Sequence, residues 1–302
     1  MKVSVVIPSK DSPSLHAALE SVAVAADQVG PSDVEAIVVD SSDAPVDIAL
    51  DTRAGGMTLT VIREPVRRLP ARLLGIRLAR GRWILNLDSD QAIHPGLLEE
   101  ILRSDRPAVA IPEVPPGDPS QWSHWERLVH RAHGNADREF RAHPTLDVPV
   151  IPRAYDRELL NRATGAILDD APGRRIENLP TQHEDTVLLS YFLRVNRLSL
   201  ADSLGFASVP IYHPIPDVRD TLRKFFRYGH DLGREARLVG QGSAGIDSSA
   251  WRQVYRVDYT RLARYWSRAS GWNGAGLVFD SVRACAYLPG MARGYLGLGY
   301  EE

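Results

Sequence analysis

The sequence predicts an α/β fold with a mostly parallel sheet flanked by helices and a helical C-terminal extension. Between residues 1 and 90, short apolar runs alternate with segments of helical periodicity, and this alternation is typical of parallel sheets. The chain has 302 residues, of which 44% are hydrophobic and 25% charged, so it can bury the core of one large domain or of two closely packed halves. Its formal net charge of −2 gives no general attraction to nucleic acid, so we expect no such partner.

The first predicted elements form the beginning of a βαβ unit. Residues 3–7 are an apolar run typical of a buried strand, and residues 14–24 carry apolar side chains at helical spacing. Residues 34–39 predict a second strand, which ends at Asp40. A helix between two such strands is the usual connection of parallel neighbours.

The next elements continue this alternation. Residues 59–62 predict a third strand, and residues 70–79 predict a helix that Gly81 ends. Residues 83–87 predict a fourth strand. The N-terminal part of the chain therefore predicts a sheet with parallel neighbours and covering helices.

Polar clusters follow three of the predicted strands, at Pro8 and Ser9, at residues 40–43 and at residues 88–90. In open α/β sheets, ligands bind beyond the carboxyl ends of the strands. We therefore expect the three clusters to meet in one ligand site.

The cluster after the fourth strand contains two carboxylates one residue apart, Asp88 and Asp90, with Ser89 between them. Strand side chains alternate with period two, so both carboxylates are expected on the same side. Carboxylate oxygens suit magnesium or manganese. The alternative is an ordinary polar turn at the end of a strand.

A second acidic pair, Glu184 and Asp185, precedes a segment of helical periodicity that runs to Asn196. Carboxylates are favoured in the first turn of a helix, where they interact with the helix dipole. A carboxylate at this place can also act as a general base. Both interpretations stay open from the residues alone.

The composition predicts three parts, residues 1–111, 112–215 and 216–302. The middle part is rich in proline and less regular, as expected of a region that shapes a substrate site. The last part contains several helical segments, with 11 basic against 5 acidic residues between Arg219 and Arg268. This basic stretch is predicted to contact a diphosphate, an anionic lipid surface or only solvent.

The apolar stretch at residues 279–298 is interrupted by Pro289 and several glycines. It is too irregular for a membrane span, so we expect it to dock on the body of the protein or to form a homodimer contact.

The single cysteine, Cys285, excludes an internal disulfide framework and a multi-cysteine zinc site. The first apolar run is broken by Pro8 and is too short for a signal peptide. We therefore expect a cytoplasmic protein, either free or peripheral at the inner membrane face.

Taken in order, these motifs resemble those of the family 2 inverting glycosyltransferases, and the resemblance covers about residues 1 to 215. Residues 3–9 resemble the first strand of that family, and residues 37–43 its second strand. Residues 71–76, which include Arg72, resemble the helix before the DxD motif, here Asp88 and Asp90. The resemblance implies a GT-A fold with a Rossmann-like sheet.

The resemblance also implies a function, which is transfer of a sugar from a nucleotide diphosphate sugar to an acceptor hydroxyl with inversion. The acceptor class stays open between a glycan, a lipid-linked glycan, a protein and a small metabolite. The implied cofactor is Mn²⁺ or Mg²⁺. The residues implied are, for the donor, Pro8, Ser9, Asp40 (at the nucleobase), Arg72, Asp88 and Ser89; for the metal, Asp88, Asp90 and His213; and for catalysis, Asp185 as general base with Glu184 orienting the acceptor.

Two residues depart from the pattern of the family. Lys10 stands where many members have an aromatic residue, and Leu73 replaces a frequent asparagine. The identity of the nucleotide therefore stays open.

The motifs leave one alternative function open and argue against two others. A catalytically inactive nucleotide-sugar-binding scaffold is compatible with the same motifs. A sugar-phosphate nucleotidyltransferase needs a glycine-rich loop after the first strand, and a dinucleotide oxidoreductase needs Gly-x-Gly-x-x-Gly there. Neither pattern occurs after Ile7.

Overall fold

The computed structural model of the protein describes residues 1–44, 56–131, 152–169, 184–240 and 274–298. Internal contacts divide the chain into two units. Unit 1 comprises Met1–Pro116, Ile151–Asp169 and Leu188–Pro214, and unit 2 comprises Gly117–Val150, Asp170–Val187 and Ile215–Glu302. The predicted three-part division at residues 111 and 215 stays a prediction.

The described part of unit 1 is built on a seven-stranded sheet with the order β3-β2-β1-β4-β8-β6-β9. The first four of these strands are parallel neighbours, whereas β8 is antiparallel to both β4 and β6. The prediction of a mostly parallel sheet is confirmed. The strands are β1 (Val3–Ser9), β2 (Val34–Asp40), β3 (Thr58–Arg63), β4 (Trp83–Asn86), β6 (Ala108–Ala110), β8 (Pro152–Asp156) and β9 (Leu204–Phe206).

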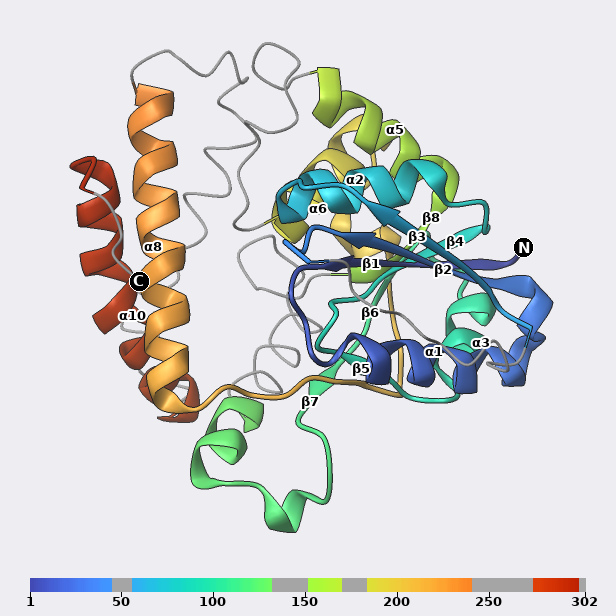
Figure 1. The fold of residues 1–302 in the computed structure, drawn as a ribbon, viewed down its shortest axis with the longest axis horizontal. Helices are drawn as coiled ribbons and strands as arrows, with labels where there is room; N and C mark the ends of the chain where they lie inside the picture. Colours follow the sequence, from blue (N-terminus) through green and yellow to red (C-terminus); the bar gives the residue numbers. More distant parts are fainter. Residues whose placement is uncertain (45–55, 132–151, 170–183, 241–273, 299–302) are drawn as a thin grey trace. The chain divides into compact units, whose positions relative to one another are not determined.

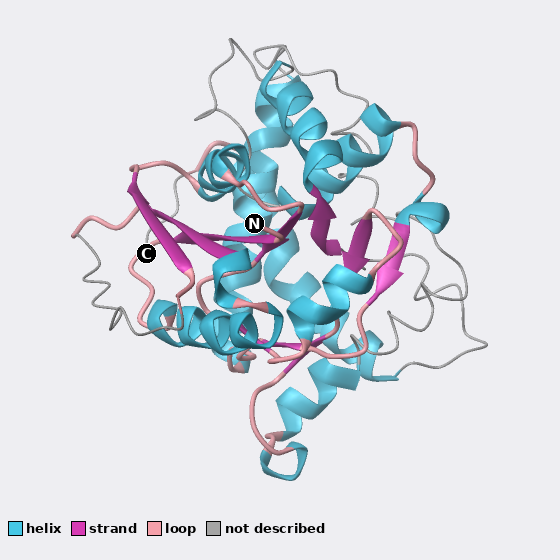
Figure 2. Ribbon diagram, turned by 90° about the vertical axis from the view of Figure 1, so that its right-hand side faces the viewer, coloured by secondary structure: helices cyan, strands magenta, loops and turns pink. Residues whose placement is uncertain are grey.

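Helices cover both faces of this sheet, as Figures 1 and 2 show. α1 and α3 lie on one face, and α2 and α5 on the other (Figure 1). This explains why every residue of β1 and β2 is buried and why most residues of both strands are apolar. The helices and 3₁₀ turns of unit 1 are α1 (Leu15–Val29), η1 (Pro31–Asp33), α2 (Arg68–Leu78), α3 (Leu97–Arg103), α5 (Arg157–Asp169) and α7 (Leu200–Ser203), and α6 (Glu184–Asn196) starts in unit 2 and continues into unit 1.

Two helix ends differ from the predictions. α1 continues past Val24 because Ala25 and Ala26 still face the core, and it stops before Gly30, whose φ of 98° is unfavourable for other residues. The prediction that Gly81 ends the next helix is wrong, because the capping residue of α2 is Ala79. Gly81 instead lies against β1, where a Cβ atom would be 2.5 Å from the backbone nitrogen of Ser4.

A small second sheet in unit 1 was not predicted. It has the order β5-β10-β7, and its strands are β5 (Ala92–Ile93), β7 (Glu113–Val114) and β10 (Ile211–Tyr212). Each strand has two residues and comes from a distant part of the chain, so no local pattern indicates the pairing. The sheet brings together the segment after Asp90, the residue Glu113 and the segment before His213.

Unit 2 contains η2 (Pro119–Gln121) and two long helices, α8 (Val218–Gly240) and α10 (Gly274–Tyr295). The two helices pack closely through Gly229 and Gly233 on α8 and Gly290 and Gly294 on α10. The predicted helical C-terminal extension is confirmed for the described residues 218–240 and 274–295. Among the described residues, no helix is both long and apolar enough to cross a bilayer.

Candidate active site

The three polar clusters meet at the carboxyl ends of β1, β2 and β4, as predicted. The backbone N–H of Ser41 donates to the oxygen of Ser9 at 2.8 Å, which joins the first cluster to the second. In the loop that follows the first cluster, the backbone N–H of Asp11 donates to Oγ of Ser42 at 2.7 Å. The hydroxyl of Ser12 in the same loop donates to the backbone oxygen of Ser89, in the third cluster, at 3.3 Å. The strand ends therefore form one continuous polar edge.

Asp40 ends β2 beside Ser9 of β1, and both side chains are buried. Oδ1 of Asp40 accepts hydrogen bonds from the backbone N–H of Ser42 at 3.1 Å and from its hydroxyl at 2.5 Å. These bonds fix the carboxylate at the edge of the sheet. Pro8 precedes Ser9 in the same strand, so the structure places all the donor residues predicted on β1 and β2 together.

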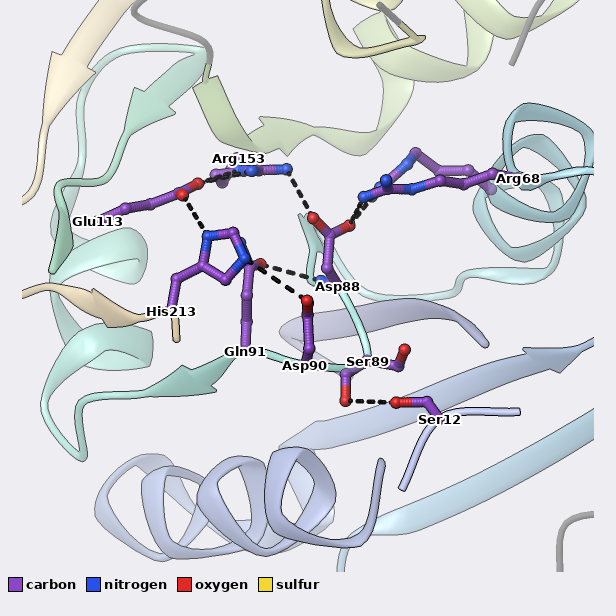
Figure 3. Close-up of polar contacts among 10 residues, drawn as sticks. Ser12, Arg68, Asp88, Ser89, Asp90, Gln91, Glu113, Arg153 and His213 are labelled. Atoms are coloured by element: carbon purple, nitrogen blue, oxygen red, sulfur yellow. Dashed lines mark hydrogen bonds and ion pairs between the residues drawn. The ribbon is translucent and has the colours of Figure 1, made fainter. Parts of the chain in front are cut away.

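Asp88 lies among three arginines, two from α2 and one from β8 (Figure 3). Its Oδ1 is 2.5 Å from Arg68 and 2.7 Å from Arg72, and its Oδ2 is 3.7 Å from Arg153. Burial alone would raise the pKa of the Asp88 carboxyl, but the three positive charges outweigh it and hold this pKa well below its ordinary value. Asp88 is therefore a carboxylate at neutral pH.

β4 ends at Asn86, so Asp88, Ser89 and Asp90 lie in the turn that follows the strand. This turn is closed by Gln91, whose side-chain oxygen accepts from the backbone N–H of Asp88 at 3.0 Å. The turn, rather than the alternation of the strand, therefore orients the two carboxylates.

His213 follows β10 and faces Asp90, with 3.5 Å between Nε2 and Oδ2 (Figure 3). Its other ring nitrogen, Nδ1, lies 3.0 Å from Oε2 of Glu113. Burial lowers the pKa of His213, but its contacts with Asp90 and Glu113 outweigh burial and raise the pKa to about 9. The sequence-predicted residues Asp90 and His213 are thus brought together.

Glu113 is the second carboxylate beside His213, and Arg153 binds it as well. Its Oε1 accepts from Nε and Nη2 of Arg153 at 3.0 and 2.5 Å. Burial would raise the pKa of Glu113, but the charge of Arg153 and the contact with His213 hold it well below its ordinary value.

A divalent metal at this site would need oxygen or nitrogen ligands from the chain. Within the described residues, no group of three or more His, Cys, Asp and Glu side chains is arranged to hold a metal ion. Mg²⁺ and similar ions, however, are commonly bound by one or two carboxylates together with substrate phosphates and water. Asp90 and Nε2 of His213 offer an oxygen and a nitrogen ligand 3.5 Å apart. These two residues therefore fit a metal completed by a diphosphate, whereas Asp88 is engaged by arginines.

The acidic pair Glu184 and Asp185 forms the first turn of α6. Glu184 is buried and Asp185 is partly exposed. Both residues belong to unit 2. Their roles as acceptor-orienting residue and general base stay predictions.

Sequence reasoning did not find Arg68, Arg153, Glu113 and Gln91. One signal was available, because Glu113 and Arg153 are single charged residues within otherwise apolar or proline-flanked segments, and buried charges are rare unless they are paired. No signal identified the partners of Glu113 and Arg153, which are at least 40 residues away along the chain.

Comparison with known proteins identifies the family of the chain. A sequence model described as Glycosyl transferase family 2 matches residues 4–162. The structure of TarS 1-349 from S. aureus, also determined with UDP, is 15% identical and aligns over 100% of this chain and 93% of that chain, with a TM-score of 0.50.

A second solved structure is the mannosyltransferase PcManGT from Pyrobaculum calidifontis in complex with GDP-Man and Mn²⁺. It is 16% identical over 98% of this chain and 87% of that chain, with a TM-score of 0.51. At such low identity these likenesses show a shared fold. No curated protein matches the chain.

Proposed function

The chain belongs to glycosyl transferase family 2, and we propose that it transfers a sugar from a nucleotide diphosphate sugar to an acceptor hydroxyl, with inversion and with a divalent metal. The observation that carries this proposal is the pairing of Asp90 with Nε2 of His213 beside the arginine-bound Asp88. These groups lie at the carboxyl edge of the parallel strands, where such sheets bind their ligands.

The charges of the site suit a diphosphate. Three arginines and His213 face the carboxylates of Asp88, Asp90 and Glu113. The positive and negative side chains of the site therefore nearly balance when no ligand is bound. A diphosphate adds negative charge, which a divalent cation and the partly exposed Arg68 can neutralise. The fold neighbours bind nucleotides of this class, the nucleoside diphosphate UDP in TarS and the sugar donor GDP-Man in PcManGT.

Each residue has a defined task in this proposal. Asp90 and His213 would hold the metal, and the bound metal would supply Lewis-acid stabilisation of the charge that develops on the leaving diphosphate. Asp40 contacts the nucleobase. Asp185 accepts the proton of the acceptor hydroxyl as that oxygen attacks the anomeric carbon on the face opposite the diphosphate, so the configuration inverts in one step.

The test is a calorimetric titration of UDP, GDP and dTDP into the protein, with and without MnCl₂. We expect one nucleotide to bind in a manganese-dependent manner. Asp90→Ala removes a metal ligand and should abolish the manganese dependence. Asp105→Ala is the matched control, because Asp105 is an exposed aspartate of unit 1 that contacts only Arg106 among the interactions described.

Binding must be followed by turnover to separate an enzyme from an inactive scaffold. Release of the nucleoside diphosphate from the matching nucleotide sugar, in the presence of an acceptor, should require the metal. If none of the three nucleotides binds under either condition, the proposal is wrong. If one binds and no acceptor class supports release, the scaffold alternative replaces it.

A further inference from the structure

Glu113 contacts one partner of each aspartate in the DxD motif. Through Oε1 it accepts from Arg153, which faces Asp88. Through Oε2 it contacts Nδ1 of His213, which faces Asp90 with Nε2. Figure 3 shows the series of contacts that joins Asp88 to Asp90 by way of Glu113. A single carboxylate is thus in contact with one side chain that faces Asp88 and with one that faces Asp90.

The backbone around Glu113 is held by the small sheet. Glu113 is the first residue of β7 and pairs with Ile211 of β10. The backbone N–H of His213 donates to the oxygen of Val114 at 2.8 Å. Because both side chains start from paired strands, their contact has a fixed geometry rather than that of two mobile surface groups.

The contact at Nδ1 decides which nitrogen of His213 is available to a metal. A neutral imidazole carries its proton on one nitrogen and has a lone pair on the other. A carboxylate at Nδ1 can only accept, so it holds a proton at Nδ1, and when a metal displaces the other proton the lone pair of Nε2 is the one available beside Asp90. Cis ligands of an octahedral ion with bonds of about 2.1 Å lie about 3 Å apart, close to the 3.5 Å between Nε2 and Asp90.

We propose that Glu113 is a positioning residue that fixes the tautomer and orientation of His213 for metal binding, and the position of Arg153 beside Asp88. This inference rests on the proposed function. Glu113 does not touch the donor or the metal in this scheme, because both its oxygens are used by His213 and Arg153. Carboxylate partners of metal-bound histidines typically change metal affinity by about 10- to 100-fold.

The diagnostic variant is Glu113→Gln, which keeps the size of the side chain. A glutamine offers one acceptor oxygen and one NH₂ group, whereas both partners of Glu113 donate N–H groups. If the NH₂ group faces Arg153, the arginine loses its acceptor. If the NH₂ group instead faces His213, it donates to Nδ1, and the proton of the imidazole moves to Nε2. We expect the affinity for Mn²⁺, measured by electron paramagnetic resonance, to fall by about 10- to 100-fold.

Glu35→Gln is the matched control. Glu35 is also buried and arginine-bound, with Oε2 accepting from Arg80 at 3.0 and 2.8 Å. It lies on β2 five residues before Asp40, at the opposite end of the strand from the site. Both variants should lower the melting temperature, but only Glu113→Gln should weaken Mn²⁺ binding. Wild-type affinity for Mn²⁺ in Glu113→Gln would overturn the inference.

A double-mutant cycle tests whether Glu113 acts through His213. In a His213→Ala background, Glu113→Gln should add little further loss of Mn²⁺ affinity, because the imidazole that it positions is gone. Fully additive losses would contradict the inference.

The tautomer can also be observed in the unaltered protein, which removes any dependence on the folding of a variant. In the complex with Mg²⁺ and the nucleoside diphosphate that binds, UDP or GDP, the ¹⁵N spectrum should show His213 protonated at Nδ1 and not at Nε2. The signal is identified by its loss in His213→Ala. Protonation at Nε2 would overturn the inference.

These outcomes separate the two proposals. If the wild type binds a nucleoside diphosphate and Mn²⁺ but Glu113→Gln binds Mn²⁺ equally well, only the role of Glu113 is wrong. If the wild type binds no nucleoside diphosphate, the proposed function is wrong. If it binds nucleotide but no Mn²⁺ or Mg²⁺, the role of Glu113 and the metal dependence are both wrong, whereas sugar transfer stands.

Discussion

Arg72 and Asp88 form a buried ion pair, with 2.7 Å between Nη2 and Oδ1 and no exposed surface on the arginine side chain. Arg68, one helical turn earlier on α2, binds the same carboxylate oxygen at 2.5 Å but is 42% exposed. The position of the turn after β4 therefore depends on a helix that covers the sheet. Arg68 and Arg72 thus share Asp88 as their partner but differ in the exposure of their side chains to solvent.

This difference in exposure predicts that replacing Arg72 destabilises the protein more than replacing Arg68. Arg72→Met removes a buried partner of a buried carboxylate and should lower the free energy of unfolding by about 3 kcal/mol. Arg68→Met removes a half-exposed partner, and its cost should be under about 1 kcal/mol because solvent screens the pair. Urea unfolding followed by circular dichroism measures both values. Equal losses would show that burial of Arg72 does not control the strength of the pair.

A second prediction concerns the assignment of the general base. Asp185→Asn keeps the size of the side chain but cannot accept the proton of the acceptor hydroxyl. We expect kcat to fall by about 10²- to 10⁴-fold, with unchanged affinity for the nucleoside diphosphate. Asp231→Asn, on α8 of the same unit, serves as the control. A kcat within threefold of the wild type, roughly 0.7 kcal/mol, would leave Asp185 as a helix N-terminal residue only.

The main features of the site could be predicted because they depend on local patterns. Continuous apolar runs identify β1, β2 and β4, since strands covered on both faces contain few polar residues. The carboxyl ends of parallel strands meet at one edge, so Asp40 and Asp88 were expected on the same edge, and hydrogen bonds join the segment of each to the loop that contains Asp11 and Ser12.

The remaining features depend on pairings that no local pattern encodes. Glu113 and His213 are 100 residues apart and meet because two strands of two residues pair in the small sheet. Strands this short have no measurable periodicity. Arg153 likewise reaches Asp88 only because β8 lies antiparallel beside β4. Sequence reasoning therefore found the motif residues but not the side chains that hold them.

The buried Glu35 predicts a pH dependence of stability at the opposite end of the sheet from the site. Burial raises the pKa of Glu35, but hydrogen bonds from Ser4 and Arg80 outweigh it and lower the pKa below its ordinary value. The unfolded chain therefore takes up the proton first as the pH falls. The stabilisation by this carboxylate is complete above the unfolded pKa of about 4.3 and is lost as the pH falls through the lower folded value.

The measurement is the free energy of unfolding of wild type and Glu35→Gln between pH 7 and pH 3. At pH 7 the variant should be less stable by about 1 to 3 kcal/mol, because Ser4 and Arg80 lose a charged partner. The difference should be constant down to about pH 5 and shrink below it. A difference that grows with acidity would contradict the direction of the pKa shift.

The last prediction concerns the packing of α8 against α10 in unit 2. A Cβ atom at Gly290 would overlap the backbone oxygen of Phe226, and one at Gly294 would overlap that of His230. Backbone oxygens of a helix cannot rotate away as a flexible side chain can, so either substitution must push the two helices apart. Gly290→Ala should therefore lower the stability of unit 2 by about 1 to 3 kcal/mol, the usual cost of overpacking.

Gly165→Ala is the control for the general effect of replacing a helical glycine. Gly165 lies within α5, and a Cβ atom there would meet nothing within 4 Å. Alanine is favoured over glycine in a helix by about 1 kcal/mol, so this variant should be as stable as the wild type or more stable. Thermal unfolding followed by circular dichroism distinguishes the two substitutions by the sign of the change. A gain of stability in Gly290→Ala would mean that the two helices can separate without loss, so that their close approach contributes nothing to the stability of unit 2.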